Sequence, residues 1–78
     1  MSKINFEDFC IKFAEALDIE DNSFTAKDFS AVSQYDSMGK ISASLLIEEQ
    51  FGFQISFDIL DNQKNIASLY AYCLSYSS

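Results

Sequence analysis

Apolar residues recur at helical spacing in separate segments of this chain, and this pattern constrains the fold more than any other feature. The first segment has one apolar stripe, formed by Phe6, Phe9, Cys10, Phe13, Ala14 and Leu17. With Asn5 as N-cap and an acidic first turn, it predicts a helix that ends near Asp18. A second stripe consists of Ile66, Leu69, Tyr70, Cys73 and Leu74. It predicts a last helix capped by Asn65, with residues 75–78 expected to fray.

The middle of the chain predicts a longer helix with two apolar faces. This helix is expected from about Ser37 to Phe51, with Gly52 as a stop signal. At the α-helical repeat, one face carries Ala43, Leu46, Ile47 and Phe51. Roughly the opposite face carries Met38, Ile41 and Leu45. One face suffices for packing in a small bundle, so the second is either a docking stripe or a second buried side.

A long connection and a short helix complete the predicted fold. Residues 19–36 are polar, with a turn at 21–23 and a short helical turn expected around Ala26 to Phe29. Phe24, Phe29 and Val32 are expected to pin this loop to the core. A short helix is predicted near Phe57 to Asp61. We therefore expect one domain over residues 1–78, an all-α, small antiparallel four-helix bundle with three main helices, one short helix and a long first loop.

Composition restricts the classes of function. The chain lacks His, the commonest general base and metal ligand, which argues against an autonomous enzyme. Its net charge of −7, with no Arg, disfavours nucleic acid and anionic membrane surfaces and favours partners with basic patches. No segment looks like a signal peptide or is long enough to span a bilayer. We expect a monomer in the cytoplasm, without membrane insertion.

Neither the cysteines nor the acidic residues predict a metal site. The spacing of Cys10 and Cys73 fits no zinc or redox motif, and each lies on an apolar stripe, so two structural free thiols are expected. Asp18, Glu20 and Asn22 loosely mimic the start of a calcium loop. The positions that need Gly and Glu in such a loop are occupied by other residues, so we reject this interpretation.

Ser37 is the residue that points to a specific chemistry. Its hydroxyl is predicted at a helix start, outside the core, and Asp36 before it favours the positive end of the helix dipole. The segment Asp36–Ile41 resembles the modification site of acyl carrier proteins. The resemblance continues along the chain at Leu45, Ile47, Glu48, Glu49, Phe51, Ile55, Ile66 and Leu69, and it includes the long first loop and the short third helix.

The resemblance implies a non-catalytic carrier. Ser37 would hold a 4'-phosphopantetheine arm, donated by coenzyme A through a phosphopantetheinyl transferase, with Asp36 helping to present the site. Acyl groups would be carried as thioesters to acyl-loading, acyl-transfer or condensing enzymes of fatty-acid, polyketide or related lipid metabolism. Met38, Ile41 and Leu45 would form the apolar docking centre, and Glu48 and Asp58 would meet Arg or Lys on partners. The many Phe residues leave little room for an acyl chain between the helices.

Several departures from typical fatty-acid carriers keep alternatives open. Gly39 and Ser42 stand where acidic residues are common, Lys40 adds a positive charge, and Ser56 replaces a common proline. These changes suggest a specialised carrier with a dedicated pathway. The residues at 36–39 also resemble D-alanyl carrier proteins, although the Trp and Pro common there are missing, and an aminoacyl or peptidyl carrier is a related alternative. In a different class, the chain is an unmodified acidic helical adaptor for a basic partner, with Ser37 acting only as a helix cap.

Overall fold

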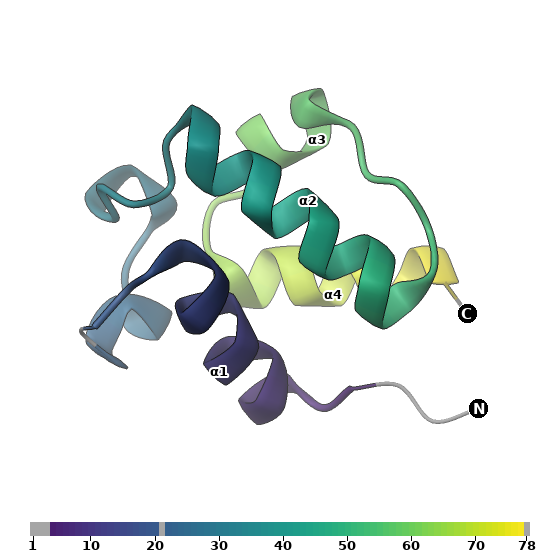
Figure 1. Ribbon diagram of the computed structural model, residues 1–78, viewed down its shortest axis with the longest axis horizontal. Helices are drawn as coiled ribbons and strands as arrows, with labels where there is room; N and C mark the ends of the chain where they lie inside the picture. Colours follow the sequence, from purple (N-terminus) through teal and green to yellow (C-terminus); the bar gives the residue numbers. More distant parts are fainter. Residues whose placement is uncertain (1–3, 21, 78) are drawn as a thin grey trace.

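Four α-helices and two short 3-10 helices form the part of the chain that the structure describes. The computed structural model describes residues 4–20 and 22–77, and within these ranges it contains helices and no strand. The α-helices are α1 (Phe6–Leu17), α2 (Ser37–Phe51), α3 (Phe57–Asp61) and α4 (Ile66–Ser77). Helix α1 packs against α2 and α4, and α2 also packs against α3 and α4 (Figure 1). The predicted all-α bundle with a long first loop is confirmed.

The bounds of the first three α-helices agree with the prediction because their end signals act locally. Asn5 Oδ1 accepts a hydrogen bond of 2.7 Å from the Asp8 amide at the start of α1. Asp18, in the left-handed conformation, ends the same helix. Gly52 ends α2 in that conformation at φ 81°, which glycine adopts without a steric penalty. Ser56 caps α3, where its Oγ accepts from the Ile59 amide.

The last helix extends further than the sequence predicts. Asn65 caps it as expected, accepting from the Ser68 amide at 2.9 Å. The expected fraying is wrong for residues 75–77, because α4 continues to Ser77, and residue 78 lies outside the described residues. The Tyr76 ring lies 4.3 Å from the Phe53 ring, centroid to centroid, and this contact gives the final turn a packing partner from the α2–α3 connection.

The first loop differs from the prediction in its local structure. It forms two 3-10 helices, η1 (Asn22–Ala26) and η2 (Phe29–Ala31). The sequence predicts instead a single short helical turn around Ala26 to Phe29. The predicted turn at 21–23 begins at a residue outside the described ranges. The three predicted pins, Phe24, Phe29 and Val32, are all buried as expected.

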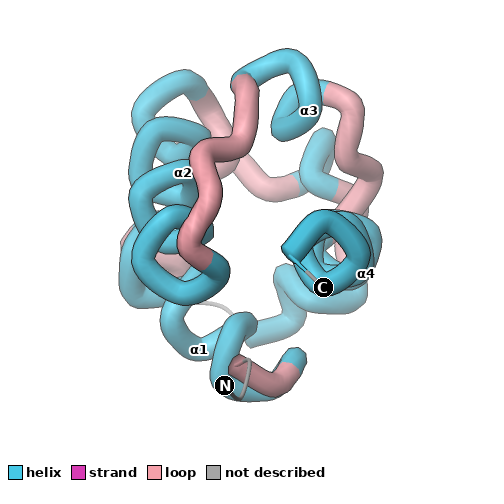
Figure 2. Tube along the Cα trace, turned by 90° about the vertical axis from the view of Figure 1, so that its right-hand side faces the viewer, coloured by secondary structure: helices cyan, strands magenta, loops and turns pink. Residues whose placement is uncertain are grey.

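The core is built around aromatic side chains from α1 and the first loop. Figure 2 shows the four helices arranged around one centre, which these side chains fill. The fully buried Phe13 ring stacks against Phe24, Phe29 and Tyr35, with centroid separations of 5.9, 5.8 and 6.2 Å. The Phe29 amide also donates to the Lys64 carbonyl at 2.7 Å, which ties the loop to the connection before α4. The long loop is therefore part of the packed bundle.

Both cysteines are free thiols in apolar surroundings. Cys73 is fully buried, and burial raises the pKa of its thiol from 9.0 to about 12. Burial, reinforced by the Glu7 carboxylate, also raises the pKa of the half-buried Cys10. Both thiols stay protonated at neutral pH, so neither is an activated nucleophile.

We predict that Cys73 resists thiol reagents in the folded protein at pH 8 and reacts only after denaturation, because the reactive thiolate is scarce and buried. Cys10 should react first. Labelling of a Cys10→Ser variant, followed by mass spectrometry with and without urea, isolates Cys73; rapid native labelling of that variant would contradict the packing.

Since the folded chain keeps a thiol proton that the unfolded chain loses above pH 9, stability should fall as pH rises towards 12.

Candidate functional site

Asp36 organises the start of α2. Its side-chain Oδ1 accepts a hydrogen bond of 2.9 Å from the Gly39 amide, and its carbonyl accepts one of 2.8 Å from the Lys40 amide. This is the geometry of an N-cap, in which a carboxylate satisfies an amide that the helix cannot pair and also meets the positive end of the helix dipole. Asp36 is therefore the cap of this helix, next to the candidate serine.

Ser37 is consequently the first residue of the helix and not its cap. Its side chain is exposed, and within the described part of the chain no hydrogen bond occupies its hydroxyl. The interpretation of Ser37 as an ordinary helix cap is wrong, because Asp36 has that role. The hydroxyl faces solvent with no structural duty in the fold.

Gly39 allows the first loop to pass directly against α2. A Cβ atom at this position would lie 1.9 Å from the Gln34 carbonyl oxygen and 3.2 Å from Leu17 Cδ2. Glycine is therefore required by close backbone approach, and position 39 is buried. The departure from the acidic residue common in related carriers has a packing reason here.

Tyr35 and Lys40 connect the start of α2 to α3. The Tyr35 hydroxyl donates to the Leu60 carbonyl at 2.7 Å, and its ring stacks on Phe29 at a centroid distance of 3.8 Å. Lys40 forms a salt bridge with Asp61 and lies 5.5 Å from the centre of the Tyr35 ring. Burial, with a smaller effect from the Asp61 carboxylate, raises the pKa of Tyr35, so its phenol remains a donor at neutral pH. Lys40 lies on α2 as expected, and its charge is paired with Asp61 of α3.

The second apolar face of α2 is exposed to solvent. Met38, Ile41 and Leu45 keep 77, 48 and 61% of their surface accessible. The opposite face is buried through Ala43, Leu46 and Ile47, so the alternative of a helix buried on two sides is wrong. An exposed row of large apolar side chains beside a free hydroxyl is typical of an interaction surface.

Phe57 on α3 is an exposed apolar residue that sequence reasoning missed. It is 44% exposed, whereas Leu60, three residues later, is fully buried. Spacing gives no signal of this exposure, because residues three apart share a helix face; only the packing of this short helix leaves Phe57 outside. Phe57 lies on α3, which packs against α2.

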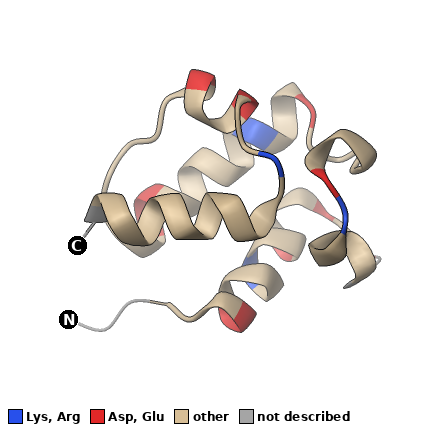
Figure 3. Cartoon of the chain, turned by 180° about the vertical axis from the view of Figure 1, so that it is seen from behind, with Lys and Arg blue, Asp and Glu red and all other residues tan. Residues whose placement is uncertain are grey.

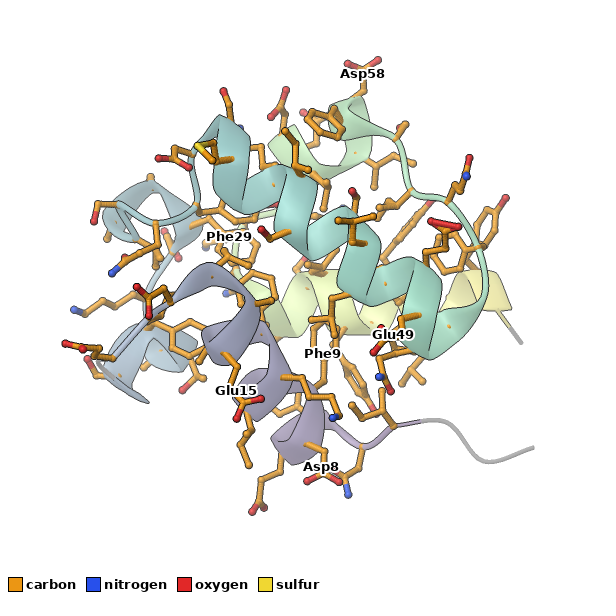
Figure 4. The ribbon with its side chains drawn as sticks, viewed as in Figure 1. Asp8, Phe9, Glu15, Phe29, Glu49 and Asp58 are labelled. Carbon is orange, nitrogen blue, oxygen red and sulfur yellow. The ribbon has the colours of Figure 1, made fainter. Side chains whose placement is uncertain are left out.

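The predicted acidic rim is exposed on the same two helices. Glu48 on α2 and Asp58 on α3 are both exposed, and Asp58 projects away from the bundle in Figure 4. Figure 3 shows that α4, in contrast, has no charged residue along its length. Negative charge is therefore available at the exposed face of α2 and α3 and absent from α4.

Comparison with known protein families identifies the class. A family model described as "Phosphopantetheine attachment site" matches residues 7–73. No curated protein and no solved structure was found to match the chain. The match extends from α1 into α4, and the chain therefore belongs to this family of carrier proteins, in which 4'-phosphopantetheine is attached covalently.

The residues at the start of α2 fit such a group. A phosphodiester needs an exposed hydroxyl as its anchor and tolerates little steric crowding, and Ser37 offers that hydroxyl. The backbone amides of Ser37 and Met38 are hydrogen-bonded to no other backbone carbonyl in the described ranges, so the positive end of the helix can face a phosphate. Carriers of this family are substrates of a phosphopantetheinyl transferase and deliver their cargo to partner enzymes.

Neither a membrane-spanning helix nor a metal site is found in residues 4–20 and 22–77. No helix there is long and apolar enough to cross a membrane. No group of three or more His, Cys, Asp or Glu side chains in residues 4–20 and 22–77 is placed to hold a metal ion.

We predict that Asp36→Ala destabilises the protein by about 1 kcal/mol, because it removes the cap of α2. Ser37→Ala should change stability by less than about 0.5 kcal/mol, since its exposed hydroxyl supports no structure. Urea unfolding of the two variants measures the difference. Equal losses, or a larger loss for Ser37→Ala, would show that the capping assignment is wrong.

We also predict that Gly39→Ala destabilises the protein by about 1–3 kcal/mol, because the added methyl group overlaps the Gln34 carbonyl. Gly52→Ala is the comparison: its Cβ meets nothing within 4 Å, and only the left-handed backbone opposes it. Amide NMR shifts should spread to Gln34 and Tyr35 in Gly39→Ala and stay near the end of α2 in Gly52→Ala. A Gly39→Ala protein as stable as the parent would refute the close approach.

Proposed function

We propose that the chain is an acyl carrier protein whose 4'-phosphopantetheine is attached to Ser37. The observation that carries this proposal is the exposed Ser37 hydroxyl at the first residue of α2, freed from capping by Asp36, in a chain of the phosphopantetheine attachment family. The family match supports attachment, and the position of this hydroxyl supports Ser37 as the residue. The chain acts as a substrate of other enzymes and not as a catalyst.

The chain contributes a nucleophile and its presentation. In the transferase, the Ser37 hydroxyl oxygen bonds to the β-phosphorus of coenzyme A, its proton passes to a base of the enzyme, and adenosine 3',5'-bisphosphate leaves. Magnesium is held mainly by the transferase. Asp36 keeps the first turn of α2 in a defined conformation, so the hydroxyl is presented from a rigid helix end. When attached, the arm supplies a terminal thiol that holds an acyl group as a thioester.

Partner enzymes are proposed to bind the exposed face of α2 and the adjacent α3. Met38, Ile41 and Leu45 form its apolar centre, and Phe57 extends it. Glu48 and Asp58 form an acidic rim that would meet Arg or Lys of a basic patch. An apolar centre within a charged rim is the usual anatomy of a transient interface, and the net charge of −7 would steer basic partners to it.

Fatty-acid, polyketide or related biosynthesis is the proposed setting, with a dedicated pathway favoured by the unusual start of α2. A D-alanyl or aminoacyl carrier differs from this proposal only in its cargo. An unmodified adaptor would bind a basic partner through the same face, but the capping role that this alternative gave to Ser37 belongs to Asp36. The two hypotheses separate on whether Ser37 accepts phosphopantetheine. We place the carrier in the cytoplasm, where coenzyme A and the transferase are available.

Intact mass spectrometry after incubation with coenzyme A, magnesium and a broad-specificity phosphopantetheinyl transferase tests the attachment. The parent should gain one phosphopantetheine group and Ser37→Ala should gain none. Ser44→Ala is the matched control, since Ser44 lies on the same helix but donates its hydroxyl to the Ile41 carbonyl; it should be modified like the parent. Modification of Ser37→Ala, or none in a folded parent, would overturn the proposal.

We predict that the double variant Met38→Ala, Leu45→Ala lowers the transferase kcat/KM by about 5- to 30-fold, the loss expected from removing two interface anchors. Urea stability should be unchanged, because both side chains are exposed. Ile11→Ala on α1, where 53% of the side chain is exposed, is the control and should keep the parent rate. Equal effects of the two changes would argue against a docking role for this face.

A further inference from the structure

A continuous seam between α1 and α2 begins beside Ser37. Its first hollow, of about 230 Å³, is lined by residues on both sides of that serine, including Asp36, Met38 and Gly39. A larger open hollow of about 430 Å³ follows, with Leu45 and Leu46 in its lining. The two hollows share Ala16 on α1 and Ser42 on α2, so they form one track along the surface.

In the described part of the chain, the core is filled by buried side chains. Phe9 and Phe13 are fully buried, and Phe13 is in ring contact with four other aromatic residues. An acyl chain inside the bundle would have to displace these rings, at the cost of close-packed contacts. The surface seam demands no such rearrangement.

The seam lies within reach of an arm on Ser37. Leu45 is eight residues further along α2, which corresponds to about 12 Å of helix rise. The arm has about fourteen backbone bonds, and at the extension of a polypeptide, 3.3–3.6 Å for three bonds, it spans roughly 15–17 Å. Its thiol therefore reaches the larger hollow without full extension, and the tether gives the cargo a high local concentration there.

The lining indicates which cargo fits. The lining of the larger hollow combines apolar Ala16, Leu45 and Leu46 with Ser42 and with charged Lys12, Glu15 and Glu49. Figure 4 shows Glu15 on α1 and Glu49 on α2, on the two sides of the seam. Two carboxylates against one ammonium disfavour a cargo with its own negative charge, whereas an uncharged chain buries apolar surface against the apolar part of the lining.

We infer that the α1–α2 seam is a binding site for the arm and for an uncharged acyl chain on its thiol. This inference rests on the proposed attachment to Ser37. Because Leu45 belongs both to the seam and to the docking stripe, a seated acyl chain covers part of the partner surface. A partner that binds this face must then move the chain, which links docking to release of the cargo.

The experiment loads the parent with a ¹³C-labelled octanoyl group as a hydrolysis-resistant amide analogue of the arm. Intact mass spectrometry first confirms that one group is added to the parent and that none is added to Ser37→Ala. Nuclear Overhauser contacts should then join the octanoyl chain to the methyl groups of Ala16, Leu45 and Leu46. Contacts to Ile47, Leu60 or Leu69, which are fully buried, would instead place the chain in the core.

A substitution that fills the seam with a larger side chain tests the inference in a second way. Ala16→Phe should abolish these contacts and make hydroxylamine cleavage of the corresponding octanoyl thioester faster by at least about threefold, because the chain loses its apolar cover. Ala71→Phe is the matched control, an exposed alanine on α4 outside the seam, and should behave like the parent.

The outcomes separate the two proposals. No added mass on a folded parent overturns the attachment to Ser37 and the inference with it. Added mass with core contacts, or with no contacts to the seam, overturns the inference and leaves the carrier function standing. Equal cleavage rates for Ala16→Phe and Ala71→Phe also count against the seam.

Discussion

The aromatic stack around Phe13 is the interaction on which the arrangement of the site depends. It holds Phe24, Phe29 and Tyr35 against α1, and so converts a long polar connection into a packed part of the bundle. Tyr35 ends that connection one residue before the cap of α2. Without the stack, the entropy of an eighteen-residue loop, residues 19–36, would oppose a defined helix start. Rigid presentation of Ser37 is thus a consequence of core packing some distance away in the sequence.

The start of α2 divides its tasks among neighbouring residues. The Asp36 side chain accepts a hydrogen bond from the Gly39 amide, and the missing side chain of Gly39 leaves room for the Gln34 carbonyl. The Tyr35 hydroxyl donates a hydrogen bond to the Leu60 carbonyl on α3. These contacts leave Ser37 with no structural task, which suits the proposed attachment of phosphopantetheine to this residue. The Ser37 hydroxyl is therefore free because the neighbouring residues make the contacts that hold the helix start in place.

Helix α2 serves two environments at once. Its buried side joins the common core, while its exposed side carries apolar residues that a free helix surface does not need. An uncovered apolar stripe costs solubility, and the strongly acidic composition offsets that cost. Aromatic rings fill the core around Phe13. The proposed site for a carried chain lies outside the bundle, where the chain would compete with partners for the same surface.

The sequence alone determined the number, order and bounds of most helices. The caps at Asn5 and Asn65 and the stop at Gly52 act within four residues, so local pattern captures them. The Ser56 cap of α3 is equally local, but it was not predicted from the sequence. The sequence also indicated the two faces of α2, which follow from helical periodicity. Ser37 was indicated by its place at the predicted helix start and by the resemblance of residues 36–41 to acyl carrier proteins.

Tertiary structure decided what depends on contacts between distant segments. The last turn of α4 is helical because Tyr76 meets Phe53, and Lys40 is paired because α3 brings Asp61 to it. The requirement for glycine at position 39 arises only when the first loop passes across α2. The α1–α2 seam exists only once the two helices are packed. Periodicity describes one element at a time, whereas these features belong to surfaces that two elements make together.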